Sequence, residues 1–109
     1  MIVKELVHAL GMVNLTHKGE DREIKGVYAC DLLSRVMSGC KENDAWITVQ
    51  THLNVIAVAT LNEPACIIIP EGIPVGEETI QKAAENNIPL LSSEMKTYDI
   101  CWQIHRLLP

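Results

Sequence analysis

The chain has 109 residues, of which 48% are hydrophobic and 21% charged, so we expect one globular domain spanning residues 1–109. Its net charge is −5 and aromatic residues make up only 4%, which argues against nucleic-acid partners and against binding to an anionic membrane surface. No apolar run approaches the roughly 20 residues of a membrane span, and the N-terminus does not resemble a signal peptide. We therefore expect a cytoplasmic protein with reduced thiols.

The first thirty residues predict one helix and two short strands. Apolar residues recur at helical spacing over 3–10, and Gly11 follows as a stop signal. Strands are expected over 13–15 and 24–29, with a polar, glycine-containing turn between them.

The next segment predicts a second helix and a third strand. An apolar stripe over 32–37 indicates the helix, with Asp31 as its expected N-cap and Gly39 as its C-terminal signal. Asn43 and Asp44 make a turn into a β-rich run over 45–49.

Residues 53–61 are ambiguous, because β-branched residues favour a strand whereas two alanines and a length of nine residues allow a buried helix. We predict a helix with Thr51 as its cap. The next run, 65–69, has the continuous apolar character of a parallel strand, and consecutive parallel strands need a crossover between them.

The last third predicts helix, strand and helix. Glu77 and Glu78 favour a helix start, and that helix is expected to end near Asn87. A strand follows over 88–91, and Thr97 is the expected cap of the final helix. The expected class is α/β, with a mainly parallel sheet of about five strands and helices on both faces.

Polar residues follow the predicted strands, where loops of a parallel sheet converge and ligands commonly bind. We take these residues as candidate ligand-binding positions, although capping of the following helices would require much the same residue types. The candidates are Asp31, Gln50, Thr51, His52, Asn54, Glu71, Gly72, Ser92, Ser93 and Thr97.

Catalytic and metal-binding motifs are missing from the sequence. The cysteines form no C-x-x-C pair, the histidines have no metal-ligand spacing, and no phosphate-binding glycine loop or nucleophile elbow occurs. Cys66 and Cys101 lie in apolar runs and are expected in the core. His52 could act as a base, but a structural role is favoured because no acidic or thiol partner is near in sequence. We expect no catalytic residues, no metal and no cofactor.

The large aromatic residues have two interpretations. Trp46 and Trp102 are expected to fill the core. The alternative is an oligomer contact, because a domain this small often completes its burial with a second copy, and we favour a homodimer.

Five segments together resemble the DRTGG domain family, and the resemblance covers nearly the whole chain. It implies a fold like the amino-terminal domain of HPr kinase/phosphorylase, and a regulatory role without catalysis. Such domains also occur beside CBS domains in some pyrophosphatases and within some phosphotransacetylases. The segments are Glu20–Gly26, Asn43-Asp44 before Trp46–Thr48, Ile67–Ile69 before Pro70-Glu71-Gly72, Asn87–Leu91, and Lys96–Tyr98.

Two loops depart from the family pattern. Where the pattern has an acidic residue with arginine, this sequence has Thr51-His52, and where it has Thr-Gly-Gly, this sequence has Pro70-Glu71-Gly72. A guanidinium and free backbone N–H groups can hold an anion, whereas a glutamate repels one and proline has no N–H. A phosphate-type ligand is therefore not expected here.

Three functional hypotheses follow. The first is a non-catalytic regulatory or interaction module, a homodimer that meets a small-molecule effector or a partner enzyme at the carboxyl ends of the strands. The second is a small enzyme or phosphotransfer component that uses His52 with Asp31, Glu71 and Glu94. The third is a redox or metal sensor that uses the cysteines.

Overall fold

Four consecutive parallel strands form the body of the sheet, and the computed structural model describes all of residues 1–109. A short fifth strand, β1, pairs antiparallel with β5 at one edge. The strand order is β1-β5-β4-β3-β2, so the expected mainly parallel α/β sheet is confirmed. The strands are β1 (Val13–Asn14), β2 (Gly26–Ala29), β3 (Asp44–Ile47), β4 (Cys66–Ile69) and β5 (Leu90–Ser92).

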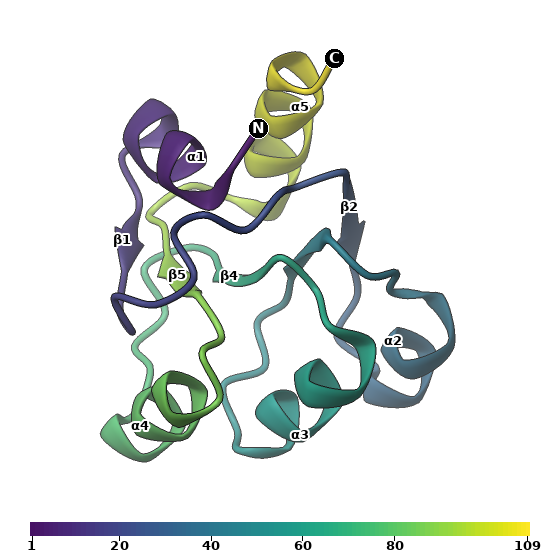
Figure 1. Cartoon of the computed structure of the whole chain (residues 1–109), viewed down its shortest axis with the longest axis vertical. Coiled ribbons are helices and arrows are strands. Elements are labelled where there is room, and N and C mark those ends of the chain that lie inside the picture. The colour runs from purple at the N-terminus through teal and green to yellow at the C-terminus, as the bar shows by residue number, and fades with distance from the viewer.

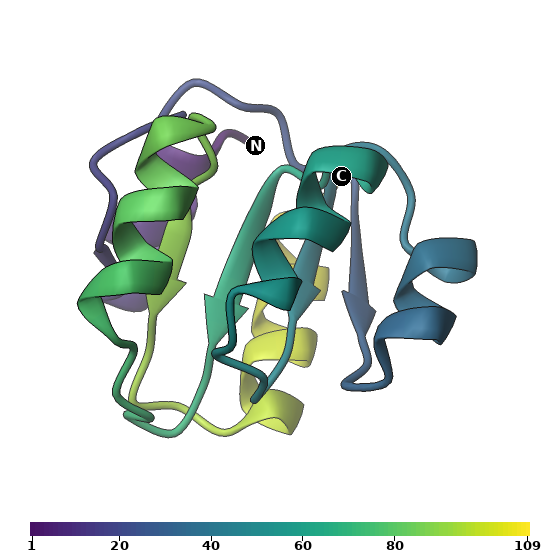
Figure 2. The ribbon, with the colours of Figure 1, turned by 90° about the horizontal axis from the view of Figure 1, so that it is seen from below.

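Helices cover both faces of this sheet (Figures 1 and 2). One face carries α1 (Val3–Leu10) and α5 (Thr97–Leu107), which bury a first hydrophobic cluster against the sheet. The other face carries α2 (Leu33–Gly39), α3 (Asn54–Asn62) and α4 (Glu77–Glu85), which bury a second cluster. None of the five helices combines the length and the apolar character needed to cross a membrane.

Alternation along each inner strand divides its side chains between the two clusters. In β3, Ala45 and Ile47 pack under α1 and α5, whereas Trp46 packs on the opposite face. In β4, all four residues are buried, because helices cover both faces of this middle strand. This explains the continuous apolar run of the sequence.

The ambiguous segment is a helix, as predicted. α3 connects the parallel strands β3 and β4 and buries Val55, Ile56, Val58 and Ala59. The β-branched residues of this segment were a misleading local signal, because the need for a crossover between parallel strands is stronger than strand propensity.

The large aromatic residues divide between core and surface. Trp46 is fully buried, as expected, and its Nε1 donates to the Cys30 carbonyl at 3.0 Å. Trp102 is 38% exposed, so its prediction as a core residue is wrong. Residues 100 and 104 of α5 point to the sheet, and Trp102 lies between them on the outer side of the helix.

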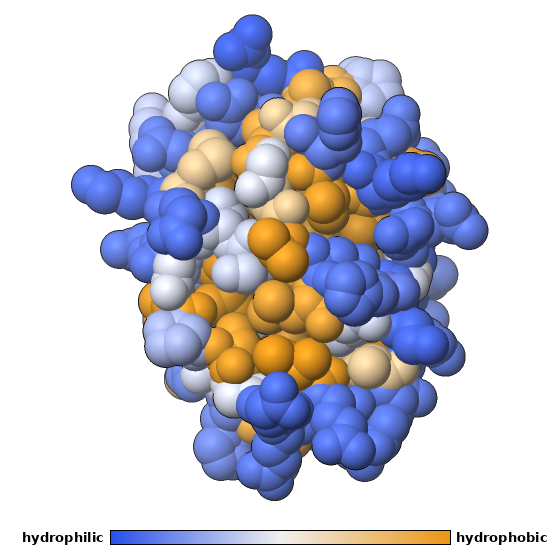
Figure 3. Space-filling model, turned by 90° about the vertical axis from the view of Figure 1, so that its left-hand side faces the viewer, coloured by the Kyte–Doolittle hydropathy of each residue, from blue (hydrophilic) through white to orange (hydrophobic).

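Other apolar side chains also remain outside the core. In α2 only Val36 is fully buried, whereas Leu32 and Met37 are exposed. Apolar surface also gathers on the side of the molecule that carries α1, β1 and α4 (Figure 3), and Val13 of the edge strand β1 is 55% exposed. Apolar surface thus lies in several separate places, and none of them by itself identifies a function.

Candidate functional site

The carboxyl ends of β2, β3, β4 and β5 lie at one edge of the sheet, the lower edge in Figure 2. The four polar loops that follow these strands are therefore neighbours, as the parallel topology requires. We call residues 30–31, 48–54, 70–72 and 92–94 the carboxyl edge. The hydrogen bonds within it show which of its polar groups already have partners.

At the ends of β2 and β3, Asp31 holds the two loops together. Its Oδ1 accepts hydrogen bonds from the Thr48 hydroxyl at 2.8 Å and from the Val49 backbone N–H at 2.9 Å. Gln50 Nε2 donates to the Asp31 carbonyl at 3.2 Å. Asp31 is therefore not the N-cap of α2, which was the prediction: Leu32 takes that position without a side-chain cap. The carboxylate is used by the adjacent strand instead of by its own helix.

At the ends of β4 and β5, backbone groups hold the loops together. Glu71 N–H donates to the Met95 carbonyl at 2.9 Å and Gly72 N–H donates to the Ser93 carbonyl at 2.8 Å. Ser93 is buried, and its hydroxyl accepts the Met95 N–H at 3.1 Å. The two N–H groups that could have held an anion in this loop are thus already bonded within the protein.

The Glu94 carboxylate packs directly onto Gly72. Gly72 and Glu71 both have left-handed backbone conformations, with φ of 64° and 60°. A side chain at position 72 would collide with the Glu94 carboxylate. A negative charge already occupies the space above the loop, so this part of the edge disfavours an anionic ligand.

Thr51, His52 and Asn54 lie between β3 and α3. His52 is exposed, and its Nδ1 accepts the Asn54 N–H at 3.2 Å, so the imidazole satisfies one of the free N–H groups at the start of α3. Thr51 does not cap this helix, contrary to our prediction. Its carbonyl accepts the hydroxyl of Thr79 at 2.9 Å, which ties the loop to α4.

The two remaining candidate residues lie on β5 and α5. Ser92 is the last residue of β5 and pairs with Val13 of β1. Thr97 is the first residue of α5, and the N-cap position belongs to Lys96, so the prediction that Thr97 caps the helix is wrong. Both side chains are half-buried.

His52 has no charged side-chain partner in the structure. His52 takes part in neither of the two ion pairs of the structure. No three histidine, cysteine, aspartate or glutamate side chains come together closely enough to hold a metal ion. His52 therefore does not converge with Asp31, Glu71 and Glu94 on such a centre.

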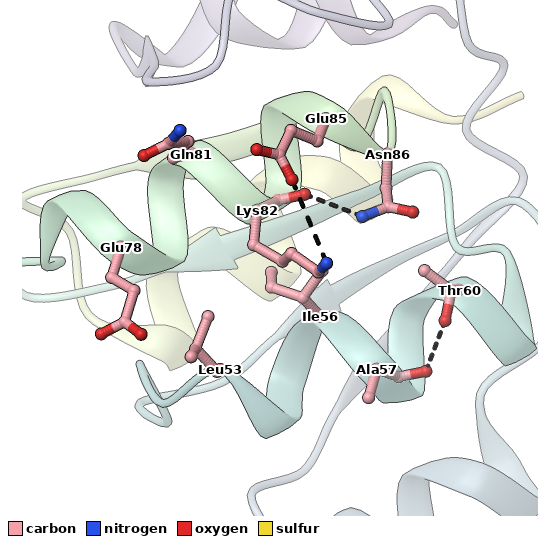
Figure 4. Close-up of a pocket in the computed structure, with 9 residues that line it drawn as sticks. All are labelled: Leu53, Ile56, Ala57, Thr60, Glu78, Gln81, Lys82, Glu85 and Asn86. Atoms are coloured by element: carbon pink, nitrogen blue, oxygen red, sulfur yellow. Dashed lines mark hydrogen bonds and ion pairs between the residues drawn. The ribbon is translucent and has the colours of Figure 1, made fainter.

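A groove of about 570 Å³ lies between α3 and α4 (Figure 4). It begins at the carboxyl edge, where Leu53 precedes α3 and Glu78 occupies the first turn of α4. Leu53, Ile56 and Ala57 supply its apolar part, and Lys82 pairs with Glu85 at 4.0 Å on the α4 side. Nothing in the sequence indicates this groove, because its lining residues have the pattern of the ordinary polar and apolar faces of two helices.

The DRTGG domain family matches residues 5–107. The chain belongs to the DRTGG domain family. No curated protein matches the sequence.

Among solved structures, this DRTGG domain is similar to the CBS and DRTGG domains of the regulatory region of Clostridium perfringens pyrophosphatase, crystallised with its activator, diadenosine tetraphosphate. The TM-score is 0.77 and the sequence identity is 16%. The match covers 99% of this chain and 47% of that chain, so the present chain spans about half of the pyrophosphatase region. At this identity the comparison shows a shared fold.

The thiols of this DRTGG domain are mostly shielded. All four cysteines are free, and Cys66 is fully buried, as predicted, whereas Cys101 is only partly buried. Burial raises the pKa of Cys40 and of Cys66 to about 12 and also raises the pKa of Cys101. Since the thiolate is the reactive form, these three thiols are poorly suited to redox sensing.

Proposed function

We propose that this DRTGG domain is a non-catalytic regulatory module that acts as a homodimer in the cytoplasm and binds a small effector or a partner enzyme at its carboxyl edge. The main support is that four polar loops meet at this edge without a catalytic arrangement among them. Family membership and the fold shared with a pyrophosphatase regulatory region support a regulatory role.

The free polar groups of the edge define the ligand chemistry. One carboxylate oxygen of Asp31, the side chain of Glu71 and Nε2 of His52 have no hydrogen-bond partner within the protein, so all three are available to a ligand. The four loops contain three carboxylates and no lysine or arginine, and Lys96 is the only basic residue that follows closely in the chain. We therefore propose an uncharged or cationic effector, in contrast to the diadenosine tetraphosphate of the pyrophosphatase region.

The α3–α4 groove extends this surface. Because it begins beside His52, a ligand held at the edge can place an apolar part against Leu53 and Ala57. A partner enzyme can use the same two features, with hydrogen bonds at the edge and apolar contacts in the groove.

A thermal-shift screen tests the proposed ligand class. The full chain is heated with a panel that contains diadenosine tetraphosphate, mononucleotides, uncharged nucleosides and small amines. Uncharged or cationic compounds should raise the melting temperature, whereas the polyphosphate should not. A shift with diadenosine tetraphosphate as large as the best of the others would contradict the proposed ligand class.

Substitutions locate the site. His52→Ala and Glu71→Ala should reduce the shift produced by the best compound, whereas His17→Ala, in an exposed loop outside the carboxyl edge, should leave it unchanged. A shift that survives both edge substitutions would show that the compound binds elsewhere. The enzyme hypothesis has no comparable structural support, because His52 lacks a carboxylate partner.

A further inference from the structure

Two of the four aromatic residues lie on the outer face of α5. Tyr98 is 77% exposed, and Trp102, one turn later, is partly exposed. Trp102 contacts one residue before it and one after it along α5: its Nε1 donates to Asp99 Oδ1 at 3.2 Å, and the guanidinium carbon of Arg106 lies 5.6 Å from the ring centroid. An indole that is fixed in one orientation loses little entropy when a partner covers it.

The charges on this face are arranged around Trp102. At about 100° per residue, Asp99 and Arg106 lie roughly 60° and 40° to one side of Trp102, and Tyr98 and His105 lie at about the same angles on the other side. Asp99 is three residues before Trp102 and Arg106 is four residues after it. The stripe is therefore acidic towards its beginning and basic towards its end, with the indole near its centre.

We propose that α5 packs antiparallel against α5 of a second copy, around a two-fold axis beside Trp102. The inference rests on the proposed homodimer and names its surface. In a two-fold interface the same patch must be complementary to itself. Antiparallel pairing satisfies this requirement, because Asp99 of each copy meets Arg106 of the other and Tyr98 meets His105.

Other features also indicate that the partner covering the outer face of α5 is a second copy of the chain. A parallel pair would bring like charges together, whereas an antiparallel pair also aligns the two helix dipoles favourably. Tyrosine, tryptophan and arginine are the residue types enriched in the energetic centres of protein interfaces. These observations distinguish α5 from the exposed apolar side chains of α2 and β1, which show no such charge pattern.

The size of the helix sets the expected affinity. α5 has 11 residues and is thus about 16 Å long. One such face buries less than the roughly 800 Å² per partner of a standard interface, so we expect a dimer that dissociates in the micromolar range.

Charge-reversal substitutions in the full chain test the antiparallel packing of the two α5 helices. Asp99→Lys alone places two lysines against two arginines, and Arg106→Glu alone places two glutamates against two aspartates. Each variant should dimerise about tenfold or more weakly than the wild type in sedimentation velocity. An equimolar mixture should recover wild-type association, because the mixed dimer has two complementary pairs. Leu61→Glu changes an exposed residue at the end of α3 and should leave the dimer intact.

The outcomes distinguish a failure of the α5 interface from a failure of the proposed homodimer. If the wild type is monomeric up to roughly 500 µM, both the homodimer and this interface are wrong. If the wild type dimerises but neither charge variant weakens the dimer, the homodimer stands and the α5 interface is wrong. If both variants weaken the dimer and the mixture does not recover it, the antiparallel arrangement is wrong. Circular dichroism of each variant confirms that folding is unchanged.

Discussion

Asp31 joins the ends of two neighbouring strands, because its Oδ1 accepts the Thr48 hydroxyl at 2.8 Å. The same atom accepts the Val49 N–H at 2.9 Å, so one carboxylate oxygen serves two donors of the adjacent strand. This contact lies at the β2 end of the carboxyl edge and fixes the position of two of its four loops.

Removing this carboxylate should weaken the fold. We expect Asp31→Ala to lower the free energy of unfolding by about 1–2 kcal/mol, because both donors lose a charged acceptor. Asp31→Asn keeps an acceptor oxygen and should cost less. Asp21→Ala serves as the control, since Asp21 is exposed in a turn, and should change stability by less than about 0.5 kcal/mol. Equal losses for Asp31→Ala and Asp21→Ala in urea unfolding would contradict this role.

Two glycines with the same backbone conformation provide a matched test of the Glu94 contact. Gly11 and Gly72 have φ of 63° and 64°, but only Gly72 has a side chain packed against it. Gly11→Ala and Gly72→Ala should each cost about 1 kcal/mol from backbone strain, because the exposed Glu94 carboxylate can move away from a new Cβ at little cost. The double variant Gly72→Ala with Glu94→Ala should therefore be about as stable as Gly72→Ala in chemical denaturation. A loss for Gly72→Ala that is much larger than the loss for Gly11→Ala, and that the double variant reverses, would show that Glu94 is fixed in place.

Asn62 holds the end of α2 from a distance. Its Nδ2 lies within hydrogen-bond distance of the carbonyls of Val36, Met37 and Cys40, at 3.0, 3.1 and 2.8 Å. Asn62→Ala should destabilise the protein by about 2 kcal/mol, and Asn62→Asp by more, because a carboxylate would face carbonyl oxygens without a proton to donate.

The matched control for Asn62 is Asn86. Its Nδ2 donates to one carbonyl, that of Lys82 at 2.9 Å, at an exposed helix end. Asn86→Ala should therefore cost about 0.5 kcal/mol or less. If the aspartate variant at position 62 were as stable as the wild type in thermal unfolding, the proposed role of Asn62 would be wrong.

The buried thiols predict a loss of stability in alkali. Burial raises the pKa of Cys40 and Cys66 in the folded protein to about 12, above the ordinary value of 9.0. A raised pKa means that the folded state binds the proton more tightly, so this stability is complete below about pH 9 and is lost as the pH rises towards 12. Cys66→Ala should reduce the slope of unfolding free energy against pH over that range, measured with urea at each pH. An unchanged slope would argue against a thiolate cost at this position.

Sequence periodicity was sufficient to predict much of the fold. The alternation of strands and helices, the buried β4 and the choice of a helix for α3 all follow from local patterns combined with the rule that parallel strands need crossovers. The predicted ends of individual strands were less accurate. The strand expected over 24–29 begins at Gly26, and the strand expected over 88–91 is Leu90–Ser92. Pro89 delays the last strand, because it has no N–H to donate to the ladder.

The candidate ligand-binding residues remain a prediction in their function, although the structure brings their loops to one edge. Local rules misassigned Asp31, Thr51 and Thr97 as helix caps. A carboxylate just before a helix usually caps that helix. The Asp31 carboxylate instead accepts a hydrogen bond from Thr48, which is 17 residues away in the sequence and comes close only when β2 and β3 are paired. No local pattern encodes that competition.

The sequence by itself determined the class of fold, the lack of lysine and arginine in the carboxyl-edge loops and the family, because composition, periodicity and the order of short segments are properties of the chain alone. Only the tertiary structure decided which polar groups remain free for a ligand, and that Trp102 faces outward between Asp99 and Arg106. The reason is geometric. Which side chains are buried and which polar groups are hydrogen-bonded depends on segments that are distant in sequence, and these segments come into contact only when the sheet is assembled.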